Sequence, residues 1–397
     1  MGDEFYGKYR HVSFRNTLFP ALRRFKLISM DNLVESMDAL EPTTAVVFPC
    51  LEKLSIRDCV RLIHASCYFP SLKELRISNI SHMSFEKIGS KLTTLTSLCI
   101  SKVFKLTFLA EQLLQNNTGL LSLQIEMCPE LLSILPHQDV LAFCTSLRSL
   151  KIEECERLSY LLDLHNLCSI EELEVLSGSN LRYFPSIVGA ISHLRLLRIS
   201  CGVEVLPTWL QSCTSLSILR IKHCPNLVSI PDLQELRSLI KLQIRYCGRL
   251  KHLPKGLDCL TRLEDLSIGG FCEELDASPS LNILHLHTAL EWLSLYECEN
   301  INLPGEIQCF TALRELCIKE FDGMTALPEW LGNLSSLQKL SLRKCKNLMH
   351  LPQAMQRLTK LEMLDIRYCP KLSERCVKES GAEWFKISHI PNIKLVV

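Results

Sequence analysis

The chain has 397 residues, and its charges nearly cancel, with 44 Lys and Arg against 43 Asp and Glu. No global field therefore points to a nucleic acid or an anionic membrane as the partner. Hydrophobic residues make up 47% of the chain, which is ample for a continuous core, yet no apolar run is long enough to predict a membrane span. The first residues lack the apolar segment of a secretory signal peptide, so we do not expect a secreted protein.

One phrase recurs along the chain, Leu-x-x-Leu-x-Ile-x-x-Cys-x-x-Leu. It stands cleanly where units begin at Leu51, Leu147, Leu216, Leu239 and Leu361. We count about 15 units with a mean spacing of roughly 24 residues, a period typical of a leucine-rich-repeat solenoid. The units begin at Leu22, Leu51, Leu72, Leu95, Leu120, Leu147, Ile170, Leu194, Leu216, Leu239, Leu263, Leu290, Leu313, Leu337 and Leu361.

The pattern predicts a single leucine-rich-repeat domain over residues 1–397. Residues 1–46 form a degenerate N-terminal repeat and loop, with Phe25 and Met30 in place of the expected Leu and Cys. Residues 47–372 hold the regular repeats, and residues 373–397 form a C-terminal cap, because a terminal repeat must cover the exposed core. We expect Trp384 and Ile390 to contribute to that cap.

Each unit is expected to begin with a short strand, because Leu-x-Ile alternation puts apolar chains on one side and variable ones on the other. Stacked in parallel, these strands form the concave face of a horseshoe-shaped α/β solenoid. A second phrase, Leu-Pro or its equivalent, follows the strand and indicates the start of an irregular or short helical return segment on the convex side, since proline suits a first helical position. It occurs at Leu135-Pro136, Phe184-Pro185, Leu206-Pro207, Ile230-Pro231, Leu253-Pro254, Leu303-Pro304, Leu327-Pro328 and Leu351-Pro352.

Eight of the 20 cysteines share one position of the repeat, which points inward in this architecture. They form a predicted structural ladder of Cys59, Cys128, Cys155, Cys224, Cys247, Cys298, Cys345 and Cys369. A buried thiol donates only weakly, so we interpret these residues mainly as compact fillers of the turn. So many free cysteines favour a reducing compartment and therefore a cytoplasmic or nuclear protein.

No motif for chemistry is present. The chain lacks the phosphate-binding, dinucleotide-binding, zinc-protease and serine-hydrolase signatures, and no Cys and His spacing resembles a zinc finger. We therefore expect no catalytic residue, no cofactor, no metal and no enzymatic activity.

The variable strand positions are the predicted binding surface. Gly269 and Gly270 are expected to leave a hollow between Tyr246 and Tyr296, and aromatic side chains beside arginine are typical of interface hot spots. Trp292, Tyr246 and Tyr296 are the predicted anchors. The candidate partner-binding residues are Lys222, Arg245, Tyr246, Gly269, Gly270, Trp292, Tyr296, Glu297, Lys319 and Arg343.

Charge along this face comes in blocks of both signs, which suits a protein partner better than a polyanion. The alternative is an ordinary solvated face without a dedicated partner. The acidic blocks are Glu153, Glu154, Glu172 and Glu174, then Glu297, Glu315 and Glu320; the basic blocks are Arg198, Arg220, Lys222, Lys241 and Arg245, then Lys339, Arg343, Lys344 and Arg367.

With the repeat, the Leu-Pro phrase and both ends considered together, the chain resembles the C-terminal repeat region of plant intracellular nucleotide-binding leucine-rich-repeat immune receptors of the coiled-coil class. The tail is the most specific match, and Gly2–Gly7 is similar to a stretch between two repeats of that family. The matching tail segments are Glu374-Arg375-Cys376, Glu379-Ser380-Gly381-Ala382-Glu383-Trp384 and Lys386-Ile387-Ser388-His389-Ile390-Pro391-Asn392-Ile393.

The resemblance implies a non-enzymatic interaction module of plant defence. In that family this region recognises a pathogen effector or a guarded host protein, and it restrains the nucleotide-binding domain. The sequence departs from the family because it contains neither the coiled coil nor the phosphate loop. Three alternatives stay open: a substrate-receptor repeat domain of a ubiquitin ligase, for which no F-box region is visible; a truncated, non-signalling relic; and an enzyme on a repeat scaffold, which no motif supports.

Overall fold

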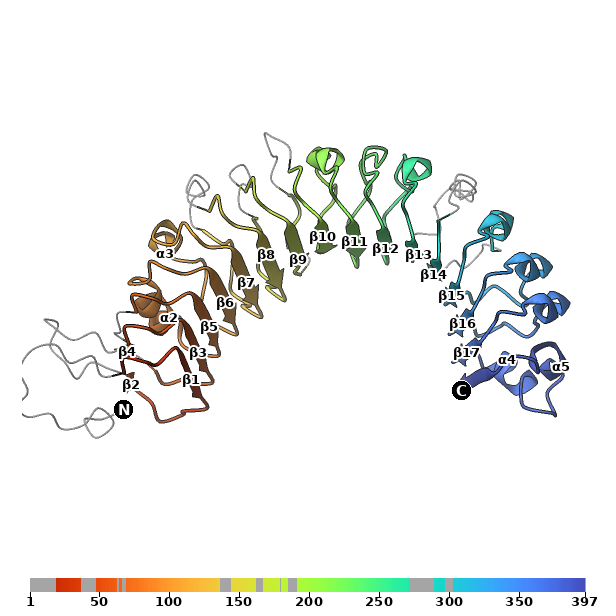
Figure 1. Cartoon of the computed structure of the whole chain (residues 1–397), viewed down its shortest axis with the longest axis horizontal. Helices are drawn as coiled ribbons and strands as arrows, with labels where there is room; N and C mark the ends of the chain where they lie inside the picture. Colours follow the sequence, from red (N-terminus) through yellow and green to blue (C-terminus); the bar gives the residue numbers. More distant parts are fainter. Residues whose placement is uncertain are drawn as a thin grey trace, which may run out of the picture. The chain divides into compact units, whose positions relative to one another are not determined.

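The computed structural model describes residues 19–36, 48–62, 64–65, 69–135, 144–161, 167–178, 180–184, 191–270, 289–296 and 303–396. The chain divides into two compact units, residues 1–194 and 195–397. In each unit parallel strands stack side by side in chain order, and the helical segments lie away from the strands (Figure 1). This is the leucine-rich-repeat solenoid that the sequence predicts.

The first unit holds a parallel sheet in which each repeat contributes one strand. A two-stranded parallel sheet of β2 (Glu35–Ser36) and β4 (His64–Ala65) stands beside it, and two α-helices, α2 (His82–Gly89) and α3 (Glu111–Gln115), fill return segments. The strands of the main sheet are β1 (Arg24–Ile28), β3 (Lys53–Arg57), β5 (Glu74–Ser78), β6 (Ser97–Ser101), β7 (Ser122–Glu126), β8 (Ser149–Glu153) and β9 (Glu172–Leu176).

The second unit has the same plan, and most of the helical segments described in it are 3₁₀ turns. Its strands are β10 (Leu196–Ser200), β11 (Ile218–Lys222), β12 (Lys241–Arg245), β13 (Asp265–Gly269), β14 (Trp292–Tyr296), β15 (Glu315–Lys319), β16 (Lys339–Arg343), β17 (Met363–Arg367) and β18 (Asn392–Val396). Its helical segments are the 3₁₀ turns η3 (Thr208–Ser212), η4 (Leu257–Cys259), η6 (Gly305–Cys309), η7 (Glu329–Asn333) and η8 (Gln353–Arg357), and the α-helices α4 (Pro370–Arg375) and α5 (Trp384–Ile387).

The register of the strands explains the period of the sequence. Every predicted repeat contributes one strand to its unit's main sheet, and that strand begins two residues after the first residue of the repeat. Equivalent residues pair across strands, so Leu242 of β12 stands between Leu219 and Leu266. These leucines are fully buried. Each repeat therefore buries its apolar side chains against the same side chains of its neighbours, which no single repeat could do alone.

A residue with a left-handed backbone follows most strands. It is usually not glycine: Asp58, Glu154, Tyr246 and Tyr368 all have φ between 51° and 54°. Its N–H donates a hydrogen bond to the last strand residue of the next repeat, as from Asp58 to Ser78 at 3.0 Å. The left-handed conformation costs a residue other than glycine about 1 kcal/mol, and this hydrogen bond offsets that cost together with the burial of the next residue. The repeat pattern alone did not reveal this turn.

The described cysteines of the ladder lie in the core. Its described members Cys59, Cys128, Cys155, Cys224, Cys247, Cys345 and Cys369 are fully buried, and Cys298 lies outside the described residues. Each thiol lies within 3.4–3.5 Å of the carbonyl oxygen two residues earlier, as Cys247 does at Arg245 and Cys369 at Arg367. The ladder cysteines therefore close the turn by weak hydrogen bonds, and are more than the fillers expected from the sequence.

The Leu-Pro phrase does introduce the return segments, but its proline stands one residue earlier than expected. Pro207, Pro304, Pro328 and Pro352 are the N-cap residues of 3₁₀ turns, with extended backbone and ψ between 134° and 152°. The fixed φ of proline suits this position, and the missing N–H is no loss before a helical turn. Trp209 of η3 is buried, so it packs within its return segment, and Trp330 of η7 is half-buried.

An asparagine that the repeat pattern did not single out anchors the end of α3. Asn117 is 2% exposed, and its amide nitrogen donates to the carbonyl oxygens of Leu92 and Leu113, both at 2.7 Å. Its amide oxygen accepts from the backbone N–H of Leu95 at 2.8 Å. One side chain thus satisfies three backbone groups of two neighbouring repeats, which keeps the buried polar atoms paired.

The tail, which we expect to cap the repeats, adds a strand that the sequence did not predict. β18 pairs in parallel with β17 and extends the sheet by one strand. Within the tail, Ile387 and Ile390 are buried, whereas Trp384 is only half-buried. Ile387 and Ile390 therefore contribute more apolar burial to this segment than Trp384 does.

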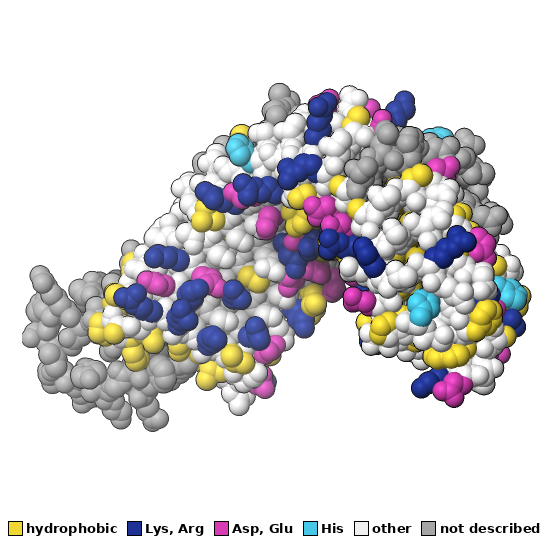
Figure 2. Space-filling view, turned by 45° about the vertical axis from the view of Figure 1, so that its right-hand side comes forward, with side chains coloured by type: hydrophobic (Ala, Val, Ile, Leu, Met, Phe, Trp, Pro, Cys, Tyr) yellow, Lys and Arg dark blue, Asp and Glu magenta, His cyan; other side chains and the backbone are white. Residues whose placement is uncertain are grey.

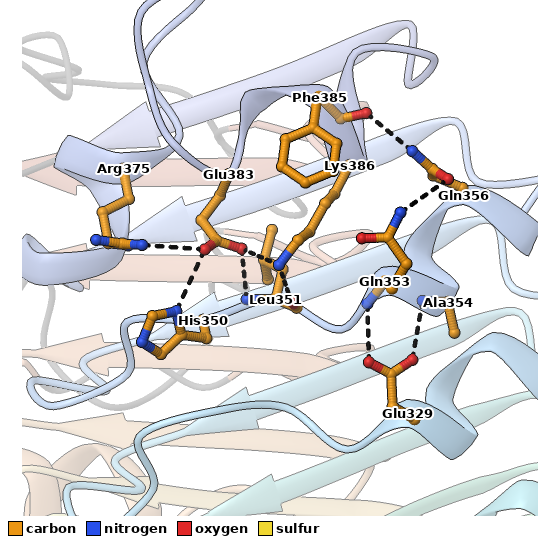
Figure 3. Close-up of polar contacts among 10 residues, drawn as sticks. All are labelled: Glu329, His350, Leu351, Gln353, Ala354, Gln356, Arg375, Glu383, Phe385 and Lys386. Atoms are coloured by element: carbon orange, nitrogen blue, oxygen red, sulfur yellow. Dashed lines mark hydrogen bonds and ion pairs between the residues drawn. The ribbon is translucent and has the colours of Figure 1, made fainter.

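A buried carboxylate fastens the cap to the preceding repeat (Figure 3). Glu383 is 3% exposed and accepts hydrogen bonds from the Leu351 backbone N–H at 3.0 Å and from Lys386 Nζ at 2.8 Å. Arg375 Nη2 and His350 Nδ1 each lie 3.3 Å from its other oxygen. Burial by itself would raise the pKa of Glu383, but these donors outweigh it and lower the pKa to about 2.

Candidate functional site

The strand-lined face of the second unit carries most of the predicted binding residues. On each strand the first, third and fifth residues face away from the core, so three rows of side chains cross the sheet. We call the fifth-residue row of β11 to β17 the terminal row. It consists of Lys222, Arg245, Gly269, Tyr296, Lys319, Arg343 and Arg367, which are partners in the strand register.

The hollow predicted at Gly269 and Gly270 is occupied by tyrosine rings. The Tyr246 and Tyr296 rings meet edge to face, with centroids 5.8 Å apart. A Cβ on Gly270 would lie 2.8 Å from the Tyr246 ring, and one on Gly269 would lie 1.8 Å from the Tyr296 carbonyl oxygen. Only glycine lets the backbone and rings approach so closely, so the two glycines position an aromatic pair and do not leave an open cavity.

Cations surround this tyrosine pair. The Arg245 guanidinium carbon lies 4.3 Å from the centre of the Tyr296 ring, and Lys319 Nζ lies 5.2–5.4 Å from the centres of both rings. These are cation–π distances. On the outer side His223 stacks on Tyr246 with centroids 4.8 Å apart and an angle of 9°. Two tyrosine rings, a histidine ring and two cations therefore lie together on this face, and His223 was not among the candidate residues.

Hydrogen bonds lock the rim of the cluster. Lys319 Nζ donates to the Tyr246 hydroxyl at 2.7 Å, and that hydroxyl donates to Glu320 at 3.2 Å. Glu320 also pairs with Lys344 Nζ at 3.1 Å. Burial would raise the pKa of Glu320, but the two lysines lower it, so this carboxylate stays ionised. The rings are thus held in place before any partner arrives.

Trp292 is separate from the tyrosine cluster, although it shares the strand of Tyr296. It is the first residue of β14, and its register partners are Asp265 and Glu315. Four residues of strand put it roughly 13 Å from Tyr296 along the chain. Its side chain is 37% exposed. The candidate residue Glu297 lies outside the described residues.

The predicted charge blocks are partly neutralised across strands. Lys241 pairs with Asp265, and Lys339 pairs with Glu315 at 2.9 Å. In the acidic block of the first unit, Lys151 pairs with Glu153 at 2.6 Å and with Glu126 at 2.9 Å. Figure 2 shows the two signs interspersed over the visible surface, without a large field of one sign.

Asp365 is a buried acid that the sequence analysis did not include. It is 2% exposed and lies in the middle row of β17. Arg343 Nη2 donates to it at 3.0 Å and Arg367 Nε at 2.8 Å. Burial would raise its pKa, but the two guanidinium groups lower it. One carboxylate therefore orients two cations of the terminal row.

Lys222 lies in a locally positive environment. Burial, together with Arg245, Arg220 and other cations nearby, lowers its pKa to about 8. No residue of β10, β11 or β12 is acidic. Lys222 and Arg245 therefore concentrate positive charge at one end of the terminal row.

Neither a metal centre nor a membrane-crossing helix is found where the structure describes the chain. Among those residues no group of three or more His, Cys, Asp or Glu could hold a metal ion. None of the helices within the same ranges has the length and apolar composition needed to cross a membrane.

Comparisons with known proteins match parts of the chain to a family model and to plant proteins. Residues 299–369 match the family described as R13L1/DRL21 leucine-rich repeats. Equivalent repeats occupy the rest of the described chain. This is a leucine-rich-repeat protein similar to plant disease resistance proteins. Leucine-rich repeats typically serve as scaffolds for protein interactions, because stacked repeats present an extended binding surface.

The similar plant proteins are much longer than the matched part. The chain is 31% identical over 188 residues to protein SUPPRESSOR OF npr1-1, CONSTITUTIVE 1 of Arabidopsis thaliana, covering 47% of this leucine-rich-repeat chain and 12% of that protein. It is 29% identical over 186 residues to disease resistance protein RPS4B of the same plant, covering 46% and 15%. The chain thus spans less than a fifth of these relatives.

A solved structure supports the fold alone. A leucine-rich-repeat protein from Leptospira interrogans superposes with a TM-score of 0.56 and 20% identity, covering 82% of this chain and 90% of that one. At that identity the likeness shows a shared solenoid and carries nothing about the partner.

Proposed function

We propose that this chain is a non-enzymatic protein-interaction module of plant innate immunity. The observation that carries the proposal is the strand-lined face of the second unit, where a preformed aromatic and cationic cluster faces solvent on a repeat scaffold. Aromatic side chains and arginine dominate the binding energy of protein interfaces. The similarity to plant disease resistance proteins supports the immune setting.

Within that setting, we propose that the module recognises a pathogen effector or a guarded host protein. In a full-length receptor it would also restrain a nucleotide-binding domain. The tail that resembles the closing segment of the coiled-coil class supports this reading, as does the cap that the tail forms around Glu383. A cytoplasmic location agrees with the free thiols found at every described cysteine.

The test is to isolate the native product with an antibody against the exposed parts of the Glu374–Ile393 tail, from healthy and from infected tissue of the source plant. Sizing and mass spectrometry would then identify the product and its companions. We expect a product well over twice 45.3 kDa that carries a phosphate loop, and an effector or a defence-related host protein bound after infection. A ubiquitin-ligase scaffold as the constant companion would support the substrate-receptor alternative instead.

The candidate face is tested on the partner so identified. Ala substitutions at Tyr246, Tyr296 and Trp292, one at a time, should each weaken binding by about 1 kcal/mol or more if these are anchors. Changes within about 0.5 kcal/mol for all three would show that another surface binds.

A further inference from the structure

The terminal row is unusual in its charge. From β11 to β17 it carries Lys or Arg on every strand except β13 and β14, and it carries no acid. The two exceptions are Gly269 and Tyr296, where the tyrosine pair stands. Two groups of cations therefore flank an aromatic platform, with Lys222 and Arg245 on one side and Lys319, Arg343 and Arg367 on the other.

Each of two carboxylates near this row pairs with two cations, so the row keeps an excess of positive charge. Asp365 forms ion pairs with both Arg343 and Arg367. Glu320 forms ion pairs with both Lys319 and Lys344. At the other end, burial and the nearby cations Arg245, Arg220, Arg198 and Lys241 lower the pKa of Lys222 to about 8. An added anion would therefore gain attraction from the row without displacing an existing pair.

The spacing of the row favours an extended chain as the occupant. Neighbouring strands are about 4.8 Å apart, so Lys222 and Arg367 are separated by roughly 29 Å across six steps. An extended peptide rises about 3.3 Å per residue, so about nine residues cover this distance. Between Arg245 and Lys319 the same peptide passes over the Tyr246 and Tyr296 rings for about four residues.

We propose that the terminal row of the second unit binds an extended acidic segment of a protein partner, about nine residues long. Carboxylates near both ends of that segment would pair with the two cation groups. A flat apolar side chain at its centre would pack on the rings of Tyr246 and Tyr296. The proposal rests on the interaction-module function above and adds the chemistry of the partner.

A peptide fits this face better than a nucleic acid does. Asp365 and Glu320 are carboxylates already in contact with cations of the row. A phosphate backbone carries charge at every nucleotide, including where it would pass these carboxylates and the uncharged tyrosine rings, whereas a peptide can place acids only where cations face it.

The test begins with selection of random nonapeptides displayed on phage against the full chain, in about 0.15 M salt. The enriched peptides are then synthesised, and their affinities are measured by fluorescence anisotropy. We expect enriched sequences with acidic residues toward both ends and an aromatic residue near the middle. An empty selection, or sequences without an excess of acid, would overturn the proposal.

A charge reversal with a matched control locates the site. Lys222→Glu should weaken binding of the selected peptide about 10-fold or more, because it turns attraction into repulsion. The substitution puts a carboxylate among cations, so it should not unfold the chain, and circular dichroism checks this. Lys360→Glu makes the same charge change at an exposed residue outside the strands and should change affinity less than about 2-fold. Equal affinities of the two variants would refute the assigned site.

A competition experiment decides between the two classes of partner. A single-stranded DNA 12-mer should displace the peptide poorly at equal concentration, and efficient displacement would mean that the row binds nucleic acid and that the proposal is wrong. The outcome of this competition does not depend on whether the protein acts in immunity. If an effector bound the Lys222→Glu variant with unchanged affinity, the proposed function would stand and only this site would be refuted.

Discussion

At the scale of single residues, the buried polar side chains of the repeats depend on particular neighbours as much as the buried leucines do. Asp365, Glu383 and Asn117 are each nearly fully buried, and each has charged or backbone partners. Burying a polar group is costly unless its hydrogen bonds are complete. Such residues therefore act through the particular neighbours that the fold provides, and removing them leaves those neighbours unpaired.

Asn117 provides a test of this view. Asn117→Ala would leave the Leu92 and Leu113 carbonyl groups and the Leu95 N–H without their partner, so we expect a loss of about 1–3 kcal/mol in the free energy of unfolding. Chemical denaturation of the first unit's transition measures it. Asn116→Ala, at the exposed neighbouring residue, is the control and should change stability by less than about 0.5 kcal/mol. Similar effects of the two substitutions would contradict the assigned role.

At the scale of elements, the C-terminal cap is held by charge as well as by apolar burial. α5 and the turn before it place Lys386 and Glu383 against the start of η8, and Lys386 Nζ also donates to the Leu351 carbonyl oxygen at 2.6 Å (Figure 3). In the same region Glu329 of η7 accepts from the first two N–H groups of η8, Gln353 at 2.9 Å and Ala354 at 3.0 Å. A side chain from one return segment thus accepts hydrogen bonds from the N–H groups at the start of the next, which have no partner within their own helical turn.

The cap should therefore loosen in acid. Since the pKa of Glu383 is lowered from 4.5 to about 2 in the folded protein, its contribution of about 3 kcal/mol is complete well above pH 4.5. The contribution declines as pH falls below 4.5 and is gone below about pH 2. Denaturation followed from pH 7 to pH 2 should show this loss for the wild type. Glu383→Gln should remove this part of the dependence and leave the part that other carboxylates with a lowered pKa, such as Asp365, contribute. An unchanged pH profile would show that the Glu383 carboxylate does not hold the cap.

At the scale of the whole molecule, stability is distributed along the chain. Nearly every hydrogen bond and apolar contact of a repeat is made within it or with its two neighbours, as the register of β11, β12 and β13 illustrates. In such a solenoid the free energy of unfolding is a sum of contributions from the single repeats and from the interfaces between neighbouring repeats. Damage to one repeat should therefore stay local, and the two units should respond separately.

Leu242→Ala tests this locality. The side chain is fully buried, so the substitution should cost about 2–5 kcal/mol. Hydrogen exchange followed by mass spectrometry should show faster exchange in β11 to β13 and little change in β5 to β7. Leu123→Ala, at the equivalent position of β7, should give the reverse pattern. Uniformly faster exchange in both units would mean that the chain unfolds as one cooperative body.

The sequence alone determined the architecture and the outline of the candidate surface. The repeat pattern recurs many times, so a deviation at one position does not obscure the strand, the turn and the return segment. The start of each strand, the burial of the cysteines and the position of the tyrosines beside arginine could therefore be predicted. The left-handed turn residues, the extra strand β18 and the roles of Asn117, Asp365 and Glu383 could not. Those depend on which side chains of different repeats meet.

Tertiary structure also decided what the candidate surface contains. From the sequence, Gly269 and Gly270 suggested an empty hollow, yet the missing Cβ of Gly270 leaves room for Tyr246, the missing Cβ of Gly269 leaves room for the Tyr296 backbone, and the two rings meet edge to face. Likewise the charge blocks were visible in the sequence, but only the register shows that Asp365 and Glu320 are each shared by two cations. The period of a repeat specifies which residues face outward, and the distances between neighbouring strands decide which of them are already occupied with one another.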